Sequence, residues 1–344
     1  FCLDTCGLVH RRLAVIDVAQ GKQPMQAARN GITATIVYNG EIYNCPELRH
    51  QLQQEGAVFQ TTCDTEVVLQ AYLHWGKACV QKLNGIFAFA IWEAETKRLF
   101  LARDRIGVKP LFYAEVPDGL VFASELKALL LHPQVPHEID ATGIAELLLM
   151  GPGRTPGCGV FRTVRELKPA QCGWYQDGSI SIECYWSLQA KPHTETFPQT
   201  AEHVRYLVKD AITRQLVSDV PIGTFLSGGL DSSIISSVAS RVMQEKGLPL
   251  HTFSVDYKDN ARYFQKSHFQ PTSDPDYIRR MAEYLDCVHH WTVLDTPALT
   301  KALYAAVDAR DLPGMVDVDS SLLLFCGAIK QQVTVALSGE CADE

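Results

Sequence analysis

Hydrophobic and polar residues follow two different patterns in the two halves of the chain. Residues 1–186 consist largely of short runs with strand-like alternation, and the clearest run, residues 32–44, reads ITATIVYNGEIYN. The Asn-Gly pair inside that run is a strong signal for a hairpin turn. Apolar residues at helical spacing predict a helix over 64–83 and a second one around 140–150, with Asp140 as its N-cap. Further short strands are expected at 98–104, 110–116 and 119–124.

The pattern changes after residues 187–200, which lack hydrophobic periodicity and contain two prolines. Beyond this segment, helical and strand-like patterns alternate, which predicts a parallel sheet covered by helices on both faces. The helices are expected at 200–218, 231–246 and 274–287, and the strands at 221–226, 250–257, 289–294 and 333–338. We therefore expect two domains, residues 1–186 and 201–344, joined by a linker at 187–200.

Composition and charge narrow the function classes. The 344 residues are enough for two domains with separate cores, and 47% hydrophobic and 20% charged residues are typical of a soluble globular protein. A formal net charge of −8, without a block of like charges, argues against a nucleic-acid-binding or membrane-binding surface. No apolar run approaches the ~18 residues of a membrane span, and no secretory signal is visible. The eleven cysteines show no zinc-binding spacing, so reduced thiols and a cytoplasmic location are expected.

Candidate chemistry begins with the run FLSGGLDSS at residues 225–233, where a predicted strand passes through two glycines into a helix. Gly228 and Gly229 allow main-chain N–H groups to approach an anion, and the new helix directs its positive end to the same place. Hydroxyl donors are added by Ser227, Ser232 and Ser233. The run has the pattern of a phosphate cradle, although it lacks the Gly-Lys-Ser/Thr of a Walker loop.

Asp231 makes this cradle more specific, because a carboxylate beside phosphates requires a Mg²⁺ ion between them. A second run, ALSGECADE at 336–344, again places Ser-Gly at the end of an apolar strand, followed by Glu340 and Asp343. Since the carboxyl ends of parallel strands share one edge, Asp231 and Asp343 would face one crevice and hold Mg²⁺ on a pyrophosphate. The alternatives are a helix N-cap at Asp231 or Ser232 and an ordinary strand-to-helix turn in the second run.

The two loops, within SDVPIGTFLSGGLDSS and LSGECADE, resemble the signature loops of the glutamine-hydrolysing asparagine synthetase family. The resemblance implies an α+β Ntn-type glutaminase domain of stacked antiparallel sheets with helices, followed by an α/β parallel-sheet ATP-pyrophosphatase domain. It implies aspartate, glutamine and ATP as substrates, Mg²⁺ as the metal, and synthesis of asparagine through a β-aspartyl adenylate. It also allows a homodimer. One departure is Cys341, where the family usually has glycine.

The resemblance also implies roles in the nucleotide site. Asp231 and Asp343 match the ligands of Mg²⁺–pyrophosphate, and Glu340 matches the base for the incoming ammonia. The main chain of Leu226 and of Val255 matches the contacts to adenine. The other matching nucleotide contacts are Ser227, Gly228, Gly229, Ser232, Ser338 and Gly339.

The first half resembles the family's glutaminase domain over nearly its whole length, in segments such as VYNGEIYN, TTCDTEVVLQAY and RDRIGVKPLFY. By that match Arg12 holds the substrate carboxylate, Asp64 takes the substrate ammonium, and Glu41 assists. The side chain of Asn39 and the N–H of Gly40 would form the oxyanion hole. Without the resemblance, the same residues would be interpreted as a surface charge at Arg12, a helix N-cap at Asp64 and a type I′ turn at Asn39-Gly40.

Several features of the sequence leave alternatives open. We derive no chemistry for Arg103, Asp104 or Lys109 and interpret them as structural or interdomain contacts. The family begins Met-Cys-Gly, with an RHRGPD-like segment before the arginine, whereas this chain begins with Phe1, so an internal fragment without activity of its own is expected. The acidic loop at 311–321 is expected to line the acceptor pocket, with no role assigned to Asp317 or Asp319.

Two rival functions remain at this point. The first is a related adenylating amide synthetase, similar to β-lactam synthetase, that acts on another carboxylate. The intact set Arg12, Asn39, Gly40 and Asp64 argues against it, because an idle glutamine pocket need not keep these residues. The second rival is a module that binds nucleotide or glutamine without catalysis.

Overall fold

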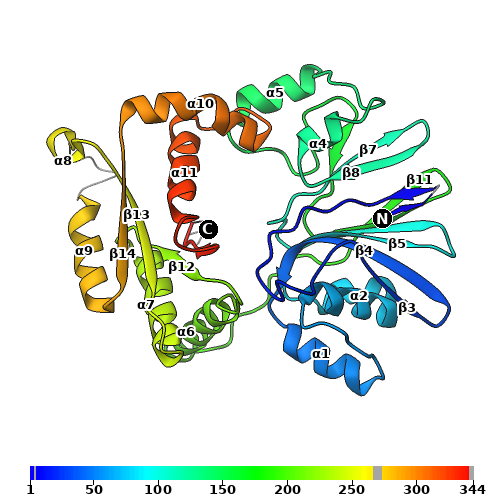
Figure 1. Ribbon diagram of the computed structural model, residues 1–344, viewed down its shortest axis with the longest axis horizontal. Coiled ribbons are helices and arrows are strands. Elements are labelled where there is room, and N and C mark those ends of the chain that lie inside the picture. The colour runs from blue at the N-terminus through cyan, green and yellow to red at the C-terminus, as the bar shows by residue number, and fades with distance from the viewer. Residues whose placement is uncertain (4, 266–272, 341–344) are drawn as a thin grey trace. The chain divides into compact units, whose positions relative to one another are not determined.

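A computed structural model describes residues 1–3, 5–265 and 273–340 of the chain (Figure 1). It divides into two compact units, Phe1–Lys191 and Pro192–Glu344, which are described separately below. None of the helices in the described ranges is long and apolar enough to cross a membrane. The ten cysteines within those ranges are all free thiols.

The first unit is built on a six-stranded antiparallel sheet with the strand order β11-β10-β6-β5-β4-β3. Its strands, in chain order, are β3 (Met25–Arg29), β4 (Ile32–Ile42), β5 (Gly85–Glu93), β6 (Arg98–Arg103), β10 (Gln171–Gln176) and β11 (Ser179–Cys184). Strands β5 and β6 lie at its centre, and both have nearly continuous runs of buried residues because each face of the sheet is covered.

One face of this sheet is covered by helices (Figure 1). They are α1 (Cys45–Gln54), α2 (Asp64–Trp75), η1 (Gly76–Ala78) and α3 (Cys79–Lys82). The opposite face packs against a three-stranded antiparallel sheet of the order β8-β7-β9, through residues such as Leu111 and Leu167. Its strands are β7 (Phe112–Val116), β8 (Gly119–Ala123) and β9 (Val164–Glu166). These stacked antiparallel sheets with helices confirm the predicted fold class of the first half.

The remaining elements of the first unit are short. They are β1 (Cys2–Leu3), β2 (Cys6–Gly7), α4 (Leu126–Leu130) and α5 (Ala141–Leu149). Asp140 caps α5 by accepting a hydrogen bond from Gly143 N at 3.0 Å, as predicted. The predicted single helix over 64–83 is interrupted instead, because Gly76 adopts φ +57° and ends α2 after Trp75.

The hairpin expected at Asn39-Gly40 is wrong, because both residues lie inside the continuous strand β4. Asn39 pairs with Ala88 and Gly40 with Phe87 of β5, in an unbroken antiparallel register. A side chain at Gly40 would collide with the main-chain oxygen of Ile86, so glycine serves the close approach of two strands here. The local turn preference of Asn-Gly is therefore overridden by pairing across the sheet.

The second unit contains a four-stranded sheet whose pairs are all parallel, in the order β14-β13-β12-β15. The strands are β12 (Ile222–Phe225), β13 (His251–Tyr257), β14 (Val288–Leu294) and β15 (Val335–Leu337). The helices are α6 (Phe197–Arg214), α7 (Leu230–Glu245), α8 (Asn260–Tyr263), α9 (Asp274–Leu285), α10 (Thr296–Arg310) and α11 (Val316–Ile329). Helix α6 begins three residues before the predicted start, because Thr196 and Gln199 form a capping box.

Helices cover both faces of this parallel sheet, as predicted (Figure 1). On one face, Ile222 packs with Ile212 and Ala239 from the segments of α6 and α7. On the other face, Phe253 packs with Phe325 of α11. The chain progresses from β12 to β13 and β14, and then returns to the other side of β12 with β15. The strand order therefore reverses between β12 and β15, which is where doubly wound proteins bind ligands.

Candidate functional site

The loop between β12 and α7 lies at this reversal of strand order. Gly228 has φ +80°, and an added Cβ there would lie 2.9 Å from Tyr277 Cβ and 3.1 Å from Ile278 N, so the loop packs tightly on α9. Gly229 is the N-cap of α7, and no side chain of the described residues caps this helix. The N-terminal N–H groups of this 16-residue helix therefore lie at the carboxyl ends of the strands, and no carboxylate in the described part of the chain caps them.

The serines of this loop mainly hold its shape. Ser232 is buried, accepts from Ser227 N at 3.2 Å and lies 2.9 Å from the Ser227 hydroxyl. Its hydroxyl also reaches Gly229 O at 3.2 Å, and the Ser233 hydroxyl donates to the same oxygen at 2.6 Å. The sequence predicted that Ser232 and Ser233 donate to a ligand, but their hydroxyls form hydrogen bonds within the loop. Ser227 is exposed.

The loop after β15 lies directly against the loop after β12. A Cβ added to Gly339 would lie 3.0 Å from Asp231 Cβ and 3.2 Å from Ser232 N, so only glycine fits this approach without a shift. Glu340 is exposed, and its N–H donates to Ser338 Oγ at 3.2 Å. The structure thus brings the two loops together, although Asp231 and Gly339 are 108 residues apart in the sequence. Cys341 and Asp343 lie outside the described residues.

The residues matched to adenine contacts lie at the same edge of the sheet. Leu226 directly follows β12, is buried, and donates its N–H to Phe253 O at 2.8 Å. Its carbonyl oxygen accepts from the Ser254 hydroxyl. Val255 lies two residues before the end of β13 and is partly buried in the core beneath α11.

The donor set at Asp231 fits a Mg²⁺ ion that arrives with phosphates. Asp231 lies in the first turn of α7, beside a loop of main-chain N–H groups and hydroxyls. Over the described ranges, three or more His, Cys, Asp or Glu residues do not gather into a ready-made metal cage. Mg²⁺ commonly takes one or two protein carboxylates, several waters and substrate phosphates, so a single described carboxylate beside an anion cradle suits it.

The acidic loop at 311–321 has a partial explanation in the structure. Asp319 lies in the first turn of α11 and pairs with Arg310 at 2.5 Å, across Gly314. Ser321, farther along α11, lies 2.8 Å from the Tyr257 hydroxyl at the end of β13. Asp319 is therefore an ion-pair partner in this loop, and Asp317 has no explanation in these contacts.

In the first unit, Asp64 begins α2 and is buried against β4. The Tyr38 hydroxyl donates to Asp64 Oδ2 at 2.7 Å, and the N–H groups of Ile42 and Thr65 also donate to this carboxylate. Burial raises the pKa of Asp64 above its usual value, although these hydrogen bonds act to lower it. Cys63 is the N-cap of α2, so the alternative interpretation of Asp64 as the N-cap is wrong.

Gly40 lies along the same edge of β4 as this carboxylate. The main-chain N–H and C=O of Tyr38 form hydrogen bonds with the Gln23 side chain, on the side of β4 that faces away from β5. In a strand, every second residue directs its main-chain N–H and C=O to the same side. Gly40 therefore directs its N–H away from β5 as Tyr38 and Ile42 do. Consistently, its partner Phe87 directs its own N–H and C=O to Asp104 on the far side.

Glu41 lies next to these groups and is half-buried. Burial and, to a lesser extent, the negative charge of Asp64 raise the pKa of Glu41 to about 7, against the opposing effect of the Lys109 ammonium. The Lys109 ammonium is therefore close enough to Glu41 to act on its charge. Sequence reasoning missed this, because Lys109 belongs to a distant segment and no spacing pattern connects the two.

Arg12 lies in the loop that precedes β3, where it is partly buried rather than a solvated surface charge. Its guanidinium donates to the main-chain oxygens of Ile16 and Asp17, the latter at 3.0 Å. The Asp17 carboxylate accepts from Thr62 N at 2.9 Å and from the Thr62 hydroxyl at 3.0 Å, two residues before Asp64. Asp17 thus ties the Arg12 loop to the entrance of α2, a role that no motif in the sequence indicated.

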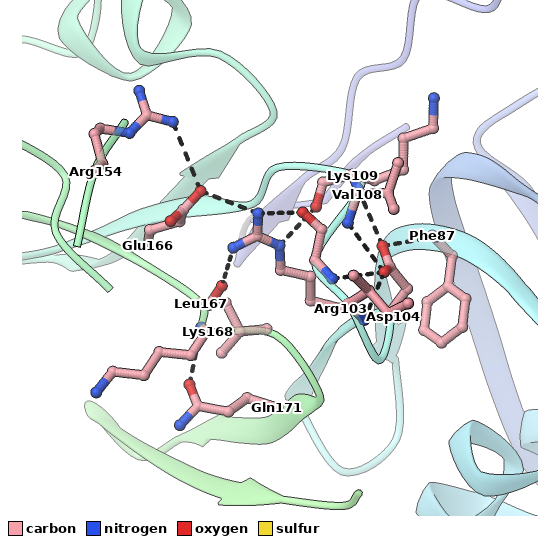
Figure 2. Close-up of polar contacts among 12 residues, drawn as sticks. Phe87, Arg103, Asp104, Val108, Lys109, Arg154, Glu166, Leu167, Lys168 and Gln171 are labelled. Carbon is pink, nitrogen blue, oxygen red and sulfur yellow. Dashed lines mark hydrogen bonds and ion pairs between the residues drawn. The ribbon is translucent and has the colours of Figure 1, made fainter. Parts of the chain in front are cut away.

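Arg103 and Asp104 are buried and form a clamp on the turn that follows β6 (Figure 2). Asp104 accepts main-chain hydrogen bonds from Phe87 at 3.2 Å and from the following turn, at Gly107 and Lys109 among others. Arg103 donates to three main-chain oxygens, those of Lys109, Leu167 and Gly107, and pairs with Glu166 at 3.1 Å. The structural interpretation of Arg103 and Asp104 is confirmed.

Comparisons with known proteins follow this division of the chain. A family model described as a glutamine amidotransferase domain matches residues 1–186, and one described as asparagine synthase matches residues 203–344. The chain is 49% identical over 336 residues to asparagine synthetase [glutamine-hydrolyzing] 3 of Bacillus subtilis (strain 168), covering 97% of this chain and 55% of that protein.

Two further relatives show the same relation. Asparagine synthetase [glutamine-hydrolyzing] 1 of Bacillus subtilis (strain 168) is 35% identical, with 98% of this chain and 51% of the relative covered. Asparagine synthetase [glutamine-hydrolyzing] of Zea mays is 32% identical, with 100% of this chain and 53% of the relative covered. The chain therefore spans about half the length of the curated relatives it matches.

Proposed function

The chain belongs to the glutamine-hydrolysing asparagine synthetase family, and on that basis we propose that the protein uses ATP and glutamine to convert aspartate into asparagine. The observation that carries the proposal is the contact of Gly339 with Asp231 and Ser232 at the reversal of strand order. This contact supports a single nucleotide site made from two loops. A cytoplasmic location is supported by the free thiols of the ten described cysteines.

In the first unit, glutamine would bind along the open edge of β4. Asp64 would receive the α-ammonium and Arg12 the α-carboxylate, since a buried carboxylate and a guanidinium complement these charges. The Gly40 N–H and the Asn39 side chain would stabilise the oxyanion that forms when the side-chain amide is attacked. Glu41 and Lys109 would set the charge of this pocket, and hydrolysis of the amide releases ammonia.

In the second unit, a side-chain carboxylate oxygen of aspartate would attack the α-phosphorus of ATP. The new O–P bond forms as the bridging α–β P–O bond breaks, and pyrophosphate leaves. Ammonia then attacks the acyl carbon of the β-aspartyl adenylate, AMP leaves, and Glu340 accepts a proton from the nitrogen. Bound Mg²⁺ would neutralise the charge of pyrophosphate. The N-terminus of α7 would hold the phosphates in line, and Asp231 would hold the Mg²⁺.

The proposal is tested with Asp231→Asn in an assay of aspartate-dependent pyrophosphate release. We expect a loss of about 100-fold, because the variant removes the carboxylate that would hold Mg²⁺ beside the phosphates, while ammonia release from glutamine stays within about twofold. The matched control is Asp276→Asn, an exposed aspartate in the first turn of α9 that pairs with Arg279. An unchanged rate in Asp231→Asn would refute the nucleotide site. Pyrophosphate release with another carboxylate but not with aspartate would favour the β-lactam-synthetase-like rival.

A further inference from the structure

Tyr38 is held at both its main chain and its hydroxyl, although sequence reasoning gave it no role. The regular pairing of β3 with β4 reaches Ile36, and beyond it the Gln23 side chain takes the place of a strand. Gln23 Oε1 accepts from Tyr38 N at 2.7 Å, and Gln23 Nε2 donates to Tyr38 O at 3.0 Å. The same amide nitrogen reaches Thr65 Oγ1 at 3.2 Å, so Gln23 connects β4 to the first turn of α2.

The Tyr38 hydroxyl forms a second connection between the same two elements. It donates to Asp64 Oδ2 at 2.7 Å, and both residues are buried, with exposed fractions of 3% and 7%. Because few water molecules reach this bond, a weakened contact there is not readily replaced by solvent. Asp64 therefore has a fixed place relative to β4, and so relative to the Gly40 N–H on the same edge.

We infer that Tyr38 is a positioning residue for glutamine: its hydroxyl holds the Asp64 carboxylate where that carboxylate receives the α-ammonium of the substrate. The inference rests on the proposed role of Asp64 in glutamine binding. Tyr38 itself contacts no reacting atom in this scheme. Its effect is on one end of the substrate, because the hydroxyl acts on the group that recognises the ammonium and not on the Arg12 loop that faces the carboxylate.

The chain offers a matched control for the loss of this hydroxyl. Tyr72 lies in α2, is buried to the same extent as Tyr38, and its hydroxyl donates to Glu93 Oε1 at 2.7 Å. Glu93 is also held by Arg98 and Thr96, at the other end of β5 from the residues that pair with Gly40. Tyr38→Phe and Tyr72→Phe thus remove the same kind of bond between a tyrosine and a buried carboxylate.

The experiment measures two dissociation constants by isothermal titration calorimetry on the whole protein. One ligand is L-glutamine and the other is glutaramate, which has the same carboxylate and amide but hydrogen in place of the α-ammonium. We expect Tyr38→Phe to weaken L-glutamine by about tenfold and to leave glutaramate unchanged, since only L-glutamine uses Asp64. Tyr72→Phe should change neither constant, and thermal unfolding verifies that both variants are folded.

Each outcome separates the positioning role from the proposed function. If the unmodified protein does not bind L-glutamine, the proposed function fails. If it binds but Tyr38→Phe has the same affinity, or loses both ligands equally, Tyr38 has at most a structural role and the inference is overturned. Should Tyr38→Phe not fold, Gln23→Leu removes the other connection and is expected to weaken L-glutamine selectively. An equal loss of both ligands in Gln23→Leu overturns the inference as well.

Discussion

Gly339→Ala tests whether the two loops of the second unit act as one site. The new Cβ would lie 3.0 Å from Asp231 Cβ, 3.2 Å from Ser232 N and 3.3 Å from Asp231 C. Carbon atoms pack at roughly 3.5–4.0 Å, so the loops must separate by about 0.5 Å. The three contacts are to main-chain atoms or to a Cβ, which cannot move without the start of α7.

The expected magnitude follows from that displacement. A misplacement of about 1 Å at a reacting group costs about 100-fold in rate, so half of that distance predicts a loss of about tenfold in aspartate-dependent pyrophosphate release. Overpacking of this kind should also destabilise the second unit by about 1 kcal/mol in urea unfolding. Ammonia release from glutamine should not change, because the substitution lies in the other unit.

The control for this prediction is Gly327→Ala in α11. A Cβ at Gly327 meets no atom of the residues that the structure describes within 4 Å, so alanine there should leave the rate unchanged and stabilise the helix by about 0.5–1 kcal/mol. The reasoning is refuted if Gly339→Ala releases pyrophosphate as fast as Gly327→Ala does. In that case the two loops tolerate separation, and a site shared between them is not needed for the reaction.

Two further predictions concern the first unit. The pKa of Glu41 is raised to about 7 from an ordinary value of 4.5, so ionisation of this carboxyl opposes folding once the pH rises above 4.5. Glu41→Gln should therefore stabilise the protein by about 1–2 kcal/mol at pH 8, a figure reduced for solvent screening, and should have no effect on stability below pH 4.5. Urea midpoints measured across this pH range would contradict the assignment if the gain does not grow with pH. Arg103→Met should cost about 3 kcal/mol in urea unfolding, because it leaves main-chain oxygens and Glu166 unpaired in a buried site. Arg165→Met, which removes an exposed pair with Glu115 at 3.6 Å, should cost less than about 1 kcal/mol, and equal losses for the two arginines would disprove the clamp.

Local pattern was sufficient where neighbouring residues decide the outcome. Alternating helices and strands after residue 200 indicated a parallel sheet, and the structure has one. Asp140 was predicted as an N-cap and is one, because a cap depends on its own first turn. The Ser-Gly-Gly run was likewise recognisable as a turn into a helix N-terminus, since glycine at Gly228 permits a positive φ.

Local pattern failed where distant residues compete with it. Asn39-Gly40 has the preference of a turn, yet it lies in a strand because β5 pairs along its whole length. Helix 64–83 was predicted as one element from its apolar spacing, and a single positive φ at Gly76 divides it. Ser232 and Ser233 were counted as free donors, but the loop uses their hydroxyls for its own main chain.

The sequence by itself determined the family, the two classes of sheet and the two Ser-Gly loops, because each depends on the order of residues along the chain. The tertiary structure decided which of those residues meet. Gly339 lies on Asp231 because β15 returns to the side of β12 opposite β13, and a strand order of this kind is a property of packing and not of any segment. Tyr38 reaches Asp64 because α2 packs on β4, so its hydroxyl acquires a partner 26 residues away that no spacing rule could have named.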